Sequence, residues 1–159
     1  MKKRANCAKG EEIMTIRKLN QSEKAEVLSM MKVFYASDAL LVHPEDAVLE
    51  KMLSDALQDT PLLTGYGFEV GGVLAGYGMV TRSYSTERGG ICVWIEDIYI
   101  LPQYRGQGIG SAFLRFVERE NPGAVRLRLE AEPENEMAMH VYQKSGFEVL
   151  GYTQLVKEL

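Results

Sequence analysis

The stretch WIEDIYILPQYRGQGIGS, residues 94–111, decides the fold of this chain. Its first half is an apolar run that contains two adjacent carboxylates, Glu96 and Asp97, and it predicts a buried strand. Its second half is a short loop of arginine and glycine, after which apolar residues recur at helical spacing. We therefore expect a strand, a tight loop and a helix in immediate succession.

The loop has the features of an anion-binding site. Arg105 supplies a fixed positive charge, and Gly106, Gly108 and Gly110 stand at alternate positions just before the expected helix. The first N–H groups of a helix lack partners within the helix and carry a partial positive charge, so they bind anions. Glycine lets an anion approach the backbone because it has no Cβ. The pattern predicts a phosphate loop, although a strand-to-helix turn that uses glycine for geometry alone fits the same residues.

Two widespread phosphate loops are excluded by their spacing. The P-loop requires Gly-x-x-x-x-Gly-Lys-Ser/Thr, and no lysine follows a glycine in that way here. The dinucleotide fingerprint requires Gly-x-Gly-x-x-Gly, whereas Gly110 comes only two residues after Gly108. Because neither pattern is present, a nucleotide-binding regulatory domain is disfavoured.

The loop does fit the pattern Arg-x-x-Gly-x-Gly over residues 105–110, directly after the apolar-x-Pro segment 100–102. A second motif, Asn-x-x-Ala-x-x-x-Tyr-x-x-x-Gly-Phe, follows over residues 135–147. With these two motifs the chain resembles the GNAT superfamily of acetyl-coenzyme A-dependent N-acetyltransferases from Thr15 to its C-terminus. Its Glu-Asp strand and its Tyr-Arg-Gly-x-Gly-Ile-Gly-Ser loop are locally similar to those of spermidine/spermine acetyltransferase-like members.

The resemblance implies an α/β fold of mixed α+β character in one acetyltransferase domain over residues 13–159. The central sheet is expected to be mixed and mostly antiparallel, with six to seven strands splayed between the fourth and the fifth and with about four helices. Residues 1–12 are expected to be an N-terminal extension or a cloning remnant. Periodicity and turn signals in the chain itself predict strands over 13–17, 66–70, 73–82, 91–100 and 125–130, and helices over 20–38, 44–60, 108–120 and 133–145. The segments 147–151 and 152–157 are predicted to form two further strands or one bent strand.

Composition and charge set further limits. The chain has 159 residues and a net charge of −4, which weakly disfavours nucleic acid and mildly favours cationic partners. Its two cysteines, Cys7 and Cys92, show neither a disulfide framework nor metal-ligand spacing, so no metal is expected. No apolar run has the length of a membrane span, and the basic start is not followed by the apolar segment that a signal peptide requires. We expect a cytoplasmic protein with no membrane partner.

Acetyl transfer to an amine first requires a base. An alkylammonium has a pKa near about 10.4, so at neutral pH its proton must leave before the nitrogen attacks. Glu96 is our candidate, because it lies two residues before Ile98, where the resemblance places the acetyl group, and because burial would raise its pKa. Asp97 points to the opposite face if the strand alternates, but a bulge is usual in this superfamily, so either carboxylate can face the site. Glu96 could instead only balance a basic group or bind the acceptor's cation.

The leaving thiolate requires an acid, and Tyr142 matches the motif tyrosine that serves the family in this role. A core tyrosine on a buried helix stripe would show the same spacing. By resemblance, the backbone of the central strand pairs with the pantetheine arm, Asn135 hydrogen-bonds that arm or its loop, and the glycine loop holds the pyrophosphate. The residues expected to bind acetyl-coenzyme A are therefore Ile98, Tyr99, Ile100, Arg105, Gly106, Gln107, Gly108, Ile109, Gly110, Ser111 and Asn135.

The acceptor is expected to be a small, cationic primary amine, because carboxylates gather near the splayed strands. Acceptor contacts are expected from Tyr35, Asp38, Asp97 and Glu130. The resemblance also implies a homodimer. Two alternatives stay open: a peptide acetyltransferase of the same fold that acts on N-termini or ribosomal proteins, and a non-catalytic domain that binds coenzyme A. The presence of a candidate base and a candidate acid favours an enzyme, since a pure binder needs neither.

Overall fold

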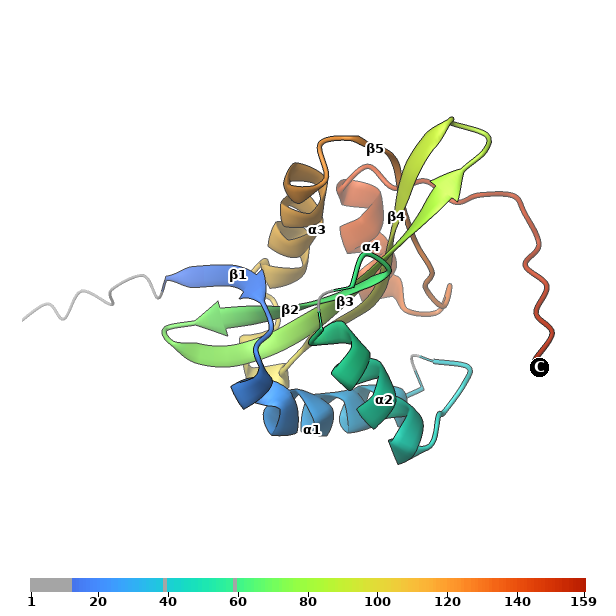
Figure 1. Ribbon diagram of the computed structural model, residues 1–159. Coiled ribbons are helices and arrows are strands. Elements are labelled where there is room, and N and C mark those ends of the chain that lie inside the picture. Colours follow the sequence, from blue (N-terminus) through green and yellow to red (C-terminus); the bar gives the residue numbers. More distant parts are fainter. Residues whose placement is uncertain (1–12, 39, 59) are drawn as a thin grey trace, which may run out of the picture.

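The computed structural model describes residues 13–38, 40–58 and 60–159, so the expected extension over residues 1–12 lies outside the described part. One five-stranded sheet runs through the molecule in the order β1-β2-β3-β4-β5 (Figure 1). The strands are β1 (Met14–Lys18), β2 (Leu63–Val70), β3 (Val73–Ser85), β4 (Gly90–Ile100) and β5 (Ala124–Leu129). The helices are α1 (Lys24–Tyr35), α2 (Asp46–Ala56), α3 (Ile109–Glu120) and α4 (Glu136–Lys144), with 3-10 turns η1 (Gln21–Glu23) and η2 (Pro102–Tyr104).

The sheet is mixed and mostly antiparallel, as predicted. Strands β1 to β4 form an antiparallel meander, and β5 returns through α3 to pair in parallel with β4. The ladder between β4 and β5 ends at the pair Ile95 and Leu129, whereas β4 continues to Ile100. The predicted splay between the fourth and fifth strands therefore opens at Glu96.

The predicted number of strands is wrong, because the described sheet has five rather than six to seven. The segment 147–159 has the alternation of a strand but forms no ladder. Alternation stabilises a strand only when one face is buried, and here Val149, Leu155 and Val156 are 78%, 94% and 85% exposed. Side-chain hydrogen bonds hold this segment instead, from Tyr152 to Glu87 and from Gln154 to Glu130.

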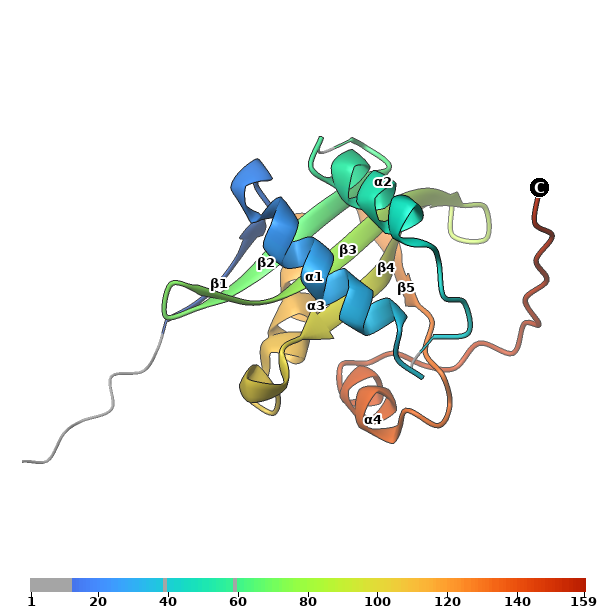
Figure 2. The ribbon, with the colours of Figure 1, turned by 90° about the horizontal axis from the view of Figure 1, so that it is seen from below.

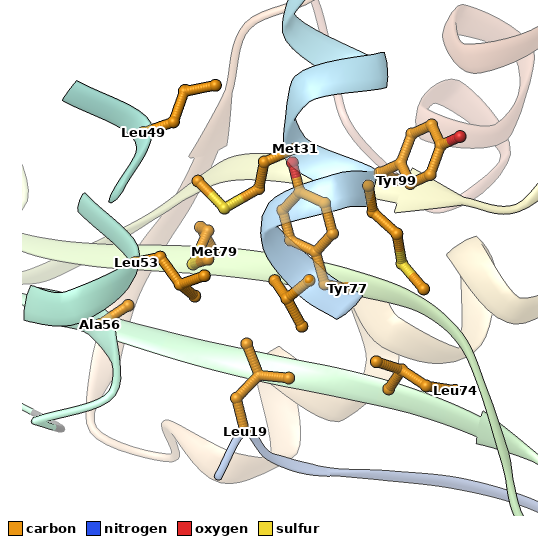
Figure 3. Close-up of a cluster of buried hydrophobic side chains, with 11 residues drawn as sticks. Leu19, Met31, Leu49, Leu53, Ala56, Leu74, Tyr77, Met79 and Tyr99 are labelled. Atoms are coloured by element: carbon orange, nitrogen blue, oxygen red, sulfur yellow. The ribbon is translucent and has the colours of Figure 1, made fainter. Parts of the chain in front are cut away.

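Two hydrophobic cores cover the two faces of the sheet. Helices α1 and α2 pack on one face through a cluster that includes Met31, Leu53, Tyr77 and Met79 (Figures 2 and 3). Helix α3, with α4 beside it, packs on the other face through a cluster around Phe113. The apolar faces of α1 and α2 therefore cover one side of the sheet, and the apolar face of α3 covers the other. Strand β4 thus has a hydrophobic core on each side.

Two glycines in β3 allow this packing to be close. A Cβ on Gly76 would lie 2.2 Å from the carbonyl oxygen of Tyr99, and a Cβ on Gly78 would lie 2.5 Å from the ring of Phe113. At Gly76 the approaching group is backbone and at Gly78 it is an aromatic side chain, so a residue with a Cβ would not fit at either position. Both glycines bring β4 and α3 nearer to the centre of the sheet, where the candidate site lies.

Candidate active site

A bulge in β4 sets the directions of its two adjacent carboxylates. Met79 of β3 pairs with Asp97, and the following residue of β3 pairs with Ile95, so Glu96 is the extra residue. Ile95 packs into the core beneath α3, whereas the side chain of Asp97 contacts Tyr35 of α1 on the other face. The regular alternation that would bring Asp97 to the side of Ile95 is thus interrupted.

Asp97 is the buried carboxylate of the site. The Tyr35 hydroxyl donates to its Oδ1 at 2.8 Å, and the Tyr77 hydroxyl donates to its Oδ2 at 3.3 Å. Only 3% of Asp97 is exposed, and this burial raises its pKa to about 6 although the two phenols stabilise the charged form. Burial and the nearby carboxylate likewise raise the pKa of Tyr35 and Tyr77 well above the ordinary value, so both remain proton donors.

Glu96 is exposed, so the predicted burial of this residue is wrong. The bulge transfers the buried position to Asp97, one residue later. Glu96 accepts a hydrogen bond from the Thr81 hydroxyl of β3. Thr81 lies two residues after Met79, which belongs to the core beneath α1 and α2, so Glu96 shares that face with Asp97. The structure therefore places both carboxylates on one face of the sheet, with Glu96 exposed and Asp97 buried.

The glycine loop connects this strand to α3 and leaves its backbone open. Arg105 donates from Nε to the carbonyl oxygen of Ile100 at 2.9 Å, and its guanidinium lies 5.8 Å from the Tyr99 ring centroid. Gly106 and Gly108 have φ values of 74° and 81°, which other residues rarely adopt. A Cβ on either would meet no atom within 4 Å.

Gly108 is the N-cap of α3 and provides no side-chain hydrogen bond to the first turn. The first turn of α3 also contains no acidic residue. Its first backbone N–H groups therefore lie at the positive end of the helix dipole without a side-chain cap, and they follow β4 residues that have no β5 partner. This arrangement is compatible with an anion, and the assignment of residues 105–111 to the pyrophosphate stays a prediction.

Tyr142 and Asn135 lie on the opposite face from the two carboxylates. Tyr142 of α4 is half-buried against the core of α3, and its ring packs edge-on against Phe147 with centroids 6.2 Å apart. Burial raises the pKa of Tyr142, and within the described residues its hydroxyl has no protein hydrogen-bond partner. Asn135 caps α4 by accepting from the Ala138 N–H at 3.2 Å.

The predicted acceptor residues separate into two groups. Tyr35 and Asp97 are brought together, whereas Asp38 is exposed in the loop after α1, and Glu130 follows β5, where it accepts from Gln154 at 2.7 Å. The sequence analysis missed Tyr77. Two features of the sequence could have identified this residue. It stands between two glycines of β3, and strand alternation directs its side chain to the core of α1.

Comparisons with known proteins agree with this geometry. Residues 28–147 match the model of the acetyltransferase (GNAT) family. The chain is 30% identical over 141 residues to thialysine N-epsilon-acetyltransferase of Mus musculus, with 82% of each chain covered. It is 36% identical over 107 residues to the Bos taurus protein of the same name, and this match spans 61% of the chain and 62% of the bovine protein.

A solved structure shares the fold. An aminoglycoside N-acetyltransferase in complex with CoA superposes with a TM-score of 0.78 at 22% identity, over 95% of this chain and 98% of that one. The sheet, the loop and the family match define the class as an acetyl-coenzyme A-dependent N-acetyltransferase. The chain belongs to the acetyltransferase (GNAT) family.

Two further observations concern the described residues alone. Their His, Cys, Asp and Glu side chains form no group of three that could hold a metal ion. None of their helices is both long and apolar enough to cross a membrane.

The loop geometry generates a prediction for coenzyme A binding. In Gly110→Ala the new Cβ has one neighbour, Ile100 Cδ1 at 3.9 Å, so the fold should persist and α3 should gain slightly in helix propensity. The methyl group stands at the helix N-terminus beside the open strand, so we expect coenzyme A affinity to fall at least about tenfold, or about 1.4 kcal/mol. Calorimetric titration measures this loss. Gly123→Ala, whose Cβ meets no atom within 4 Å, should bind like the parent. Equal affinity in all three proteins would contradict the loop assignment.

The burial of Asp97 generates a prediction for stability. Its pKa is about 6 in the fold against an ordinary 3.8, so the folded state binds the proton more tightly and loses stability as pH rises from about 4 to 6. Asp97→Asn removes this penalty. We expect its free energy of unfolding, relative to the parent, to rise by about 2 kcal/mol between pH 4 and pH 7. Urea unfolding at both pH values measures the change, and the exposed Asp38→Asn should show none. A difference independent of pH would show that Asp97 is not the buried titrating group.

Proposed function

We propose that the protein moves the acetyl group of acetyl-coenzyme A directly to the primary amine of a cationic small molecule. The observation that carries this proposal is the bulge at Glu96, which places two carboxylates on one face where β4 parts from β5. The anion-binding loop lies at the end of the same strand. An amine can therefore meet carboxylates from one face of the sheet while the cofactor lies against the loop and α4.

The cofactor needs few side chains in this arrangement. The backbone of residues 98–100, free of a β5 partner, is proposed to pair with the pantetheine amides, and Arg105 with the N-terminus of α3 is proposed to hold the pyrophosphate. Asn135 keeps its amide N–H groups for the arm, because its side-chain oxygen already caps α4. The thioester then stands between the face of Asp97 and the face of Tyr142.

Each proton in the reaction has a proposed partner. Glu96 is exposed, so it can reach an acceptor ammonium that arrives from solvent, and it takes the proton that blocks attack. The freed nitrogen forms a bond to the acetyl carbon, the carbon–sulfur bond breaks, and the nitrogen releases its second proton to solvent, from which Tyr142 is later reprotonated. Tyr142, whose hydroxyl has no partner among the described residues, gives its proton to the departing thiolate. Asp97 cannot serve in the same direct way, because a phenol occupies each of its oxygens.

The cationic acceptor is supported by charge and by the relatives. Glu96 and Asp97 give this face a negative potential, which attracts cations. The named relatives act on amines, thialysine at its N-epsilon nitrogen and aminoglycosides in the structural neighbour. A cytoplasmic location and a homodimer stay expectations from the family resemblance.

An acetylation screen over cationic, neutral and anionic amines and peptides, with detection of the free thiol, tests the proposal. Glu96→Gln should raise the acceptor KM by removing charge and should flatten the acidic limb of the pH–rate profile by removing the base. Glu118→Gln, on the exposed side of α3, makes the same change in net charge and should leave both unchanged. A neutral or anionic best acceptor, or an unchanged pH profile in Glu96→Gln, would overturn the assignment.

The proton donor has its own test. Tyr142→Phe should lower kcat by roughly a hundredfold or more with little change in the KM for acetyl-coenzyme A, since the hydroxyl acts only as the thiolate leaves. Tyr84→Phe is the matched control, because Tyr84 is 65% exposed in the β3–β4 hairpin. Steady-state kinetics with saturating acceptor measures both variants. Equal turnover in Tyr142→Phe and the parent would make Tyr142 a core residue without a part in the chemistry.

A further inference from the structure

The hydroxyl group of Thr81 in β3 donates a hydrogen bond to only one of the two carboxylate oxygens of Glu96. The accepting atom is Oε1. Within residues 13–38, 40–58 and 60–159, the other oxygen, Oε2, has no hydrogen-bond partner. One oxygen of this carboxylate is therefore anchored to the sheet, and the other is left for an ammonium group that arrives from solvent.

The ladders of the sheet give Glu96 no partner on either side. The bulge removes it from the register with β3, and the ladder with β5 ends one residue earlier, at Ile95. Its side chain is exposed, so packing does not restrict it. Ordering a glutamate side chain in solvent costs conformational entropy, because the free side chain samples many rotamers. The direction of this carboxylate thus depends on the bond from Thr81.

The position of Thr81 is itself fixed by a row of paired residues that crosses the sheet. Thr81 pairs with Leu63 of β2 on one side and with Trp94 of β4 on the other, and Trp94 pairs with Arg128 of β5. The guanidinium carbon of Arg128 lies 4.3 Å from the centroid of the indole ring. Residues paired in this way point to the same face. A β-branched side chain has few rotamers, so the sheet sets the direction of the Thr81 hydroxyl.

This anchoring point also separates the two carboxylates of the site. Asp97 pairs with Met79, which lies two residues from Thr81 along β3, or about 7 Å at the rise of a strand. Besides burial, the charge of Glu96 raises the pKa of Asp97, so the two carboxylates repel each other. The hydroxyl of Thr81 holds the carboxylate of Glu96 at the level of Trp94 and away from Asp97.

We propose that Thr81 is a positioning residue that holds the carboxylate of Glu96 in the orientation in which it takes the proton of the acceptor amine. This inference rests on the proposed function, in which Glu96 is the base. Thr81 acts through Glu96 and contacts neither the amine nor acetyl-coenzyme A. A base without a fixed direction meets the ammonium in a productive geometry less often, so loss of the hydroxyl lowers kcat.

Single substitutions at Thr81 give the first test, with the amine that the acetylation screen shows to be the best acceptor, at saturation. Thr81→Val removes the hydroxyl and keeps the branched shape, and we expect kcat to fall roughly tenfold with little change in the KM for acetyl-coenzyme A. Thr81→Ser keeps the hydroxyl and should retain most of the parent turnover. Thr15→Val makes the same chemical change at an exposed position of β1, at the other edge of the sheet, and should behave like the parent.

A double-mutant cycle with Glu96→Ala separates positioning from a structural effect. Once Glu96 is removed, the hydroxyl has no carboxylate to direct, so adding Thr81→Val to Glu96→Ala should leave kcat unchanged. A further fall of the same size in the double variant would overturn the inference, because Thr81 would then act independently of Glu96. Parent-like kcat in Thr81→Val would overturn it as well, and Thr81→Ala gives the same reading if Thr81→Val does not fold.

The same experiment distinguishes the failure of this inference from the failure of the proposed function. In both outcomes that overturn the positioning role, a low kcat of Glu96→Ala would still support Glu96 as the base. Parent-like turnover in Glu96→Ala would instead overturn the assignment of the base and, with it, the role of Thr81. The absence of turnover with every amine in the parent would overturn the proposed function itself.

Discussion

One extra residue in β4 controls what the molecule can present to a substrate. Without it, Glu96 and Asp97 would point to opposite faces, and one carboxylate would enter the core of α3. The bulge directs both carboxylates toward the face that α1 and α2 cover. On that face Glu96 stays exposed to solvent, whereas Asp97 is buried. It also lies at the last rung that β4 shares with β5. The bulge, the two carboxylates and the end of the β4–β5 ladder therefore lie within a few residues of one another.

The buried carboxylate connects three elements of the fold. A charged group in a core is tolerated only when its oxygens are satisfied, and here α1 contributes one phenol and β3 the other. The ring of Phe34 packs against the rings of both phenols and of Tyr99, with centroids 5.2, 6.5 and 5.9 Å apart for Tyr35, Tyr77 and Tyr99. The cost of this burial appears as the raised pKa of Asp97. What it stabilises is the position of Tyr35 and hence of the end of α1, next to the loop that precedes α2.

How much of this could be predicted depends on whether the signal was local. The strand, loop and helix of residues 94–111 were predicted correctly because glycine, proline and apolar spacing act within a few residues, and Asn135 was placed correctly at the start of α4. The exchange of burial between Glu96 and Asp97 was not predicted, because it depends on the register with β3, which no short stretch of sequence encodes. The two C-terminal strands were predicted from alternation alone, and the described sheet provides no buried face for them. The roles of Glu96 and Tyr142 stay predictions.

The arrangement of charges along β4 bears on selectivity as well as attraction. Two carboxylates alone would draw in every cation, since electrostatic attraction in an open site is long-ranged and discriminates poorly. Arg128 adds a cation at the level of Trp94 on the same face, where it interacts electrostatically with Glu87. A ligand with one positive group and a ligand with several therefore meet different potentials along this face. Discrimination among amines depends on such differences, because specificity is a difference between two free energies of binding.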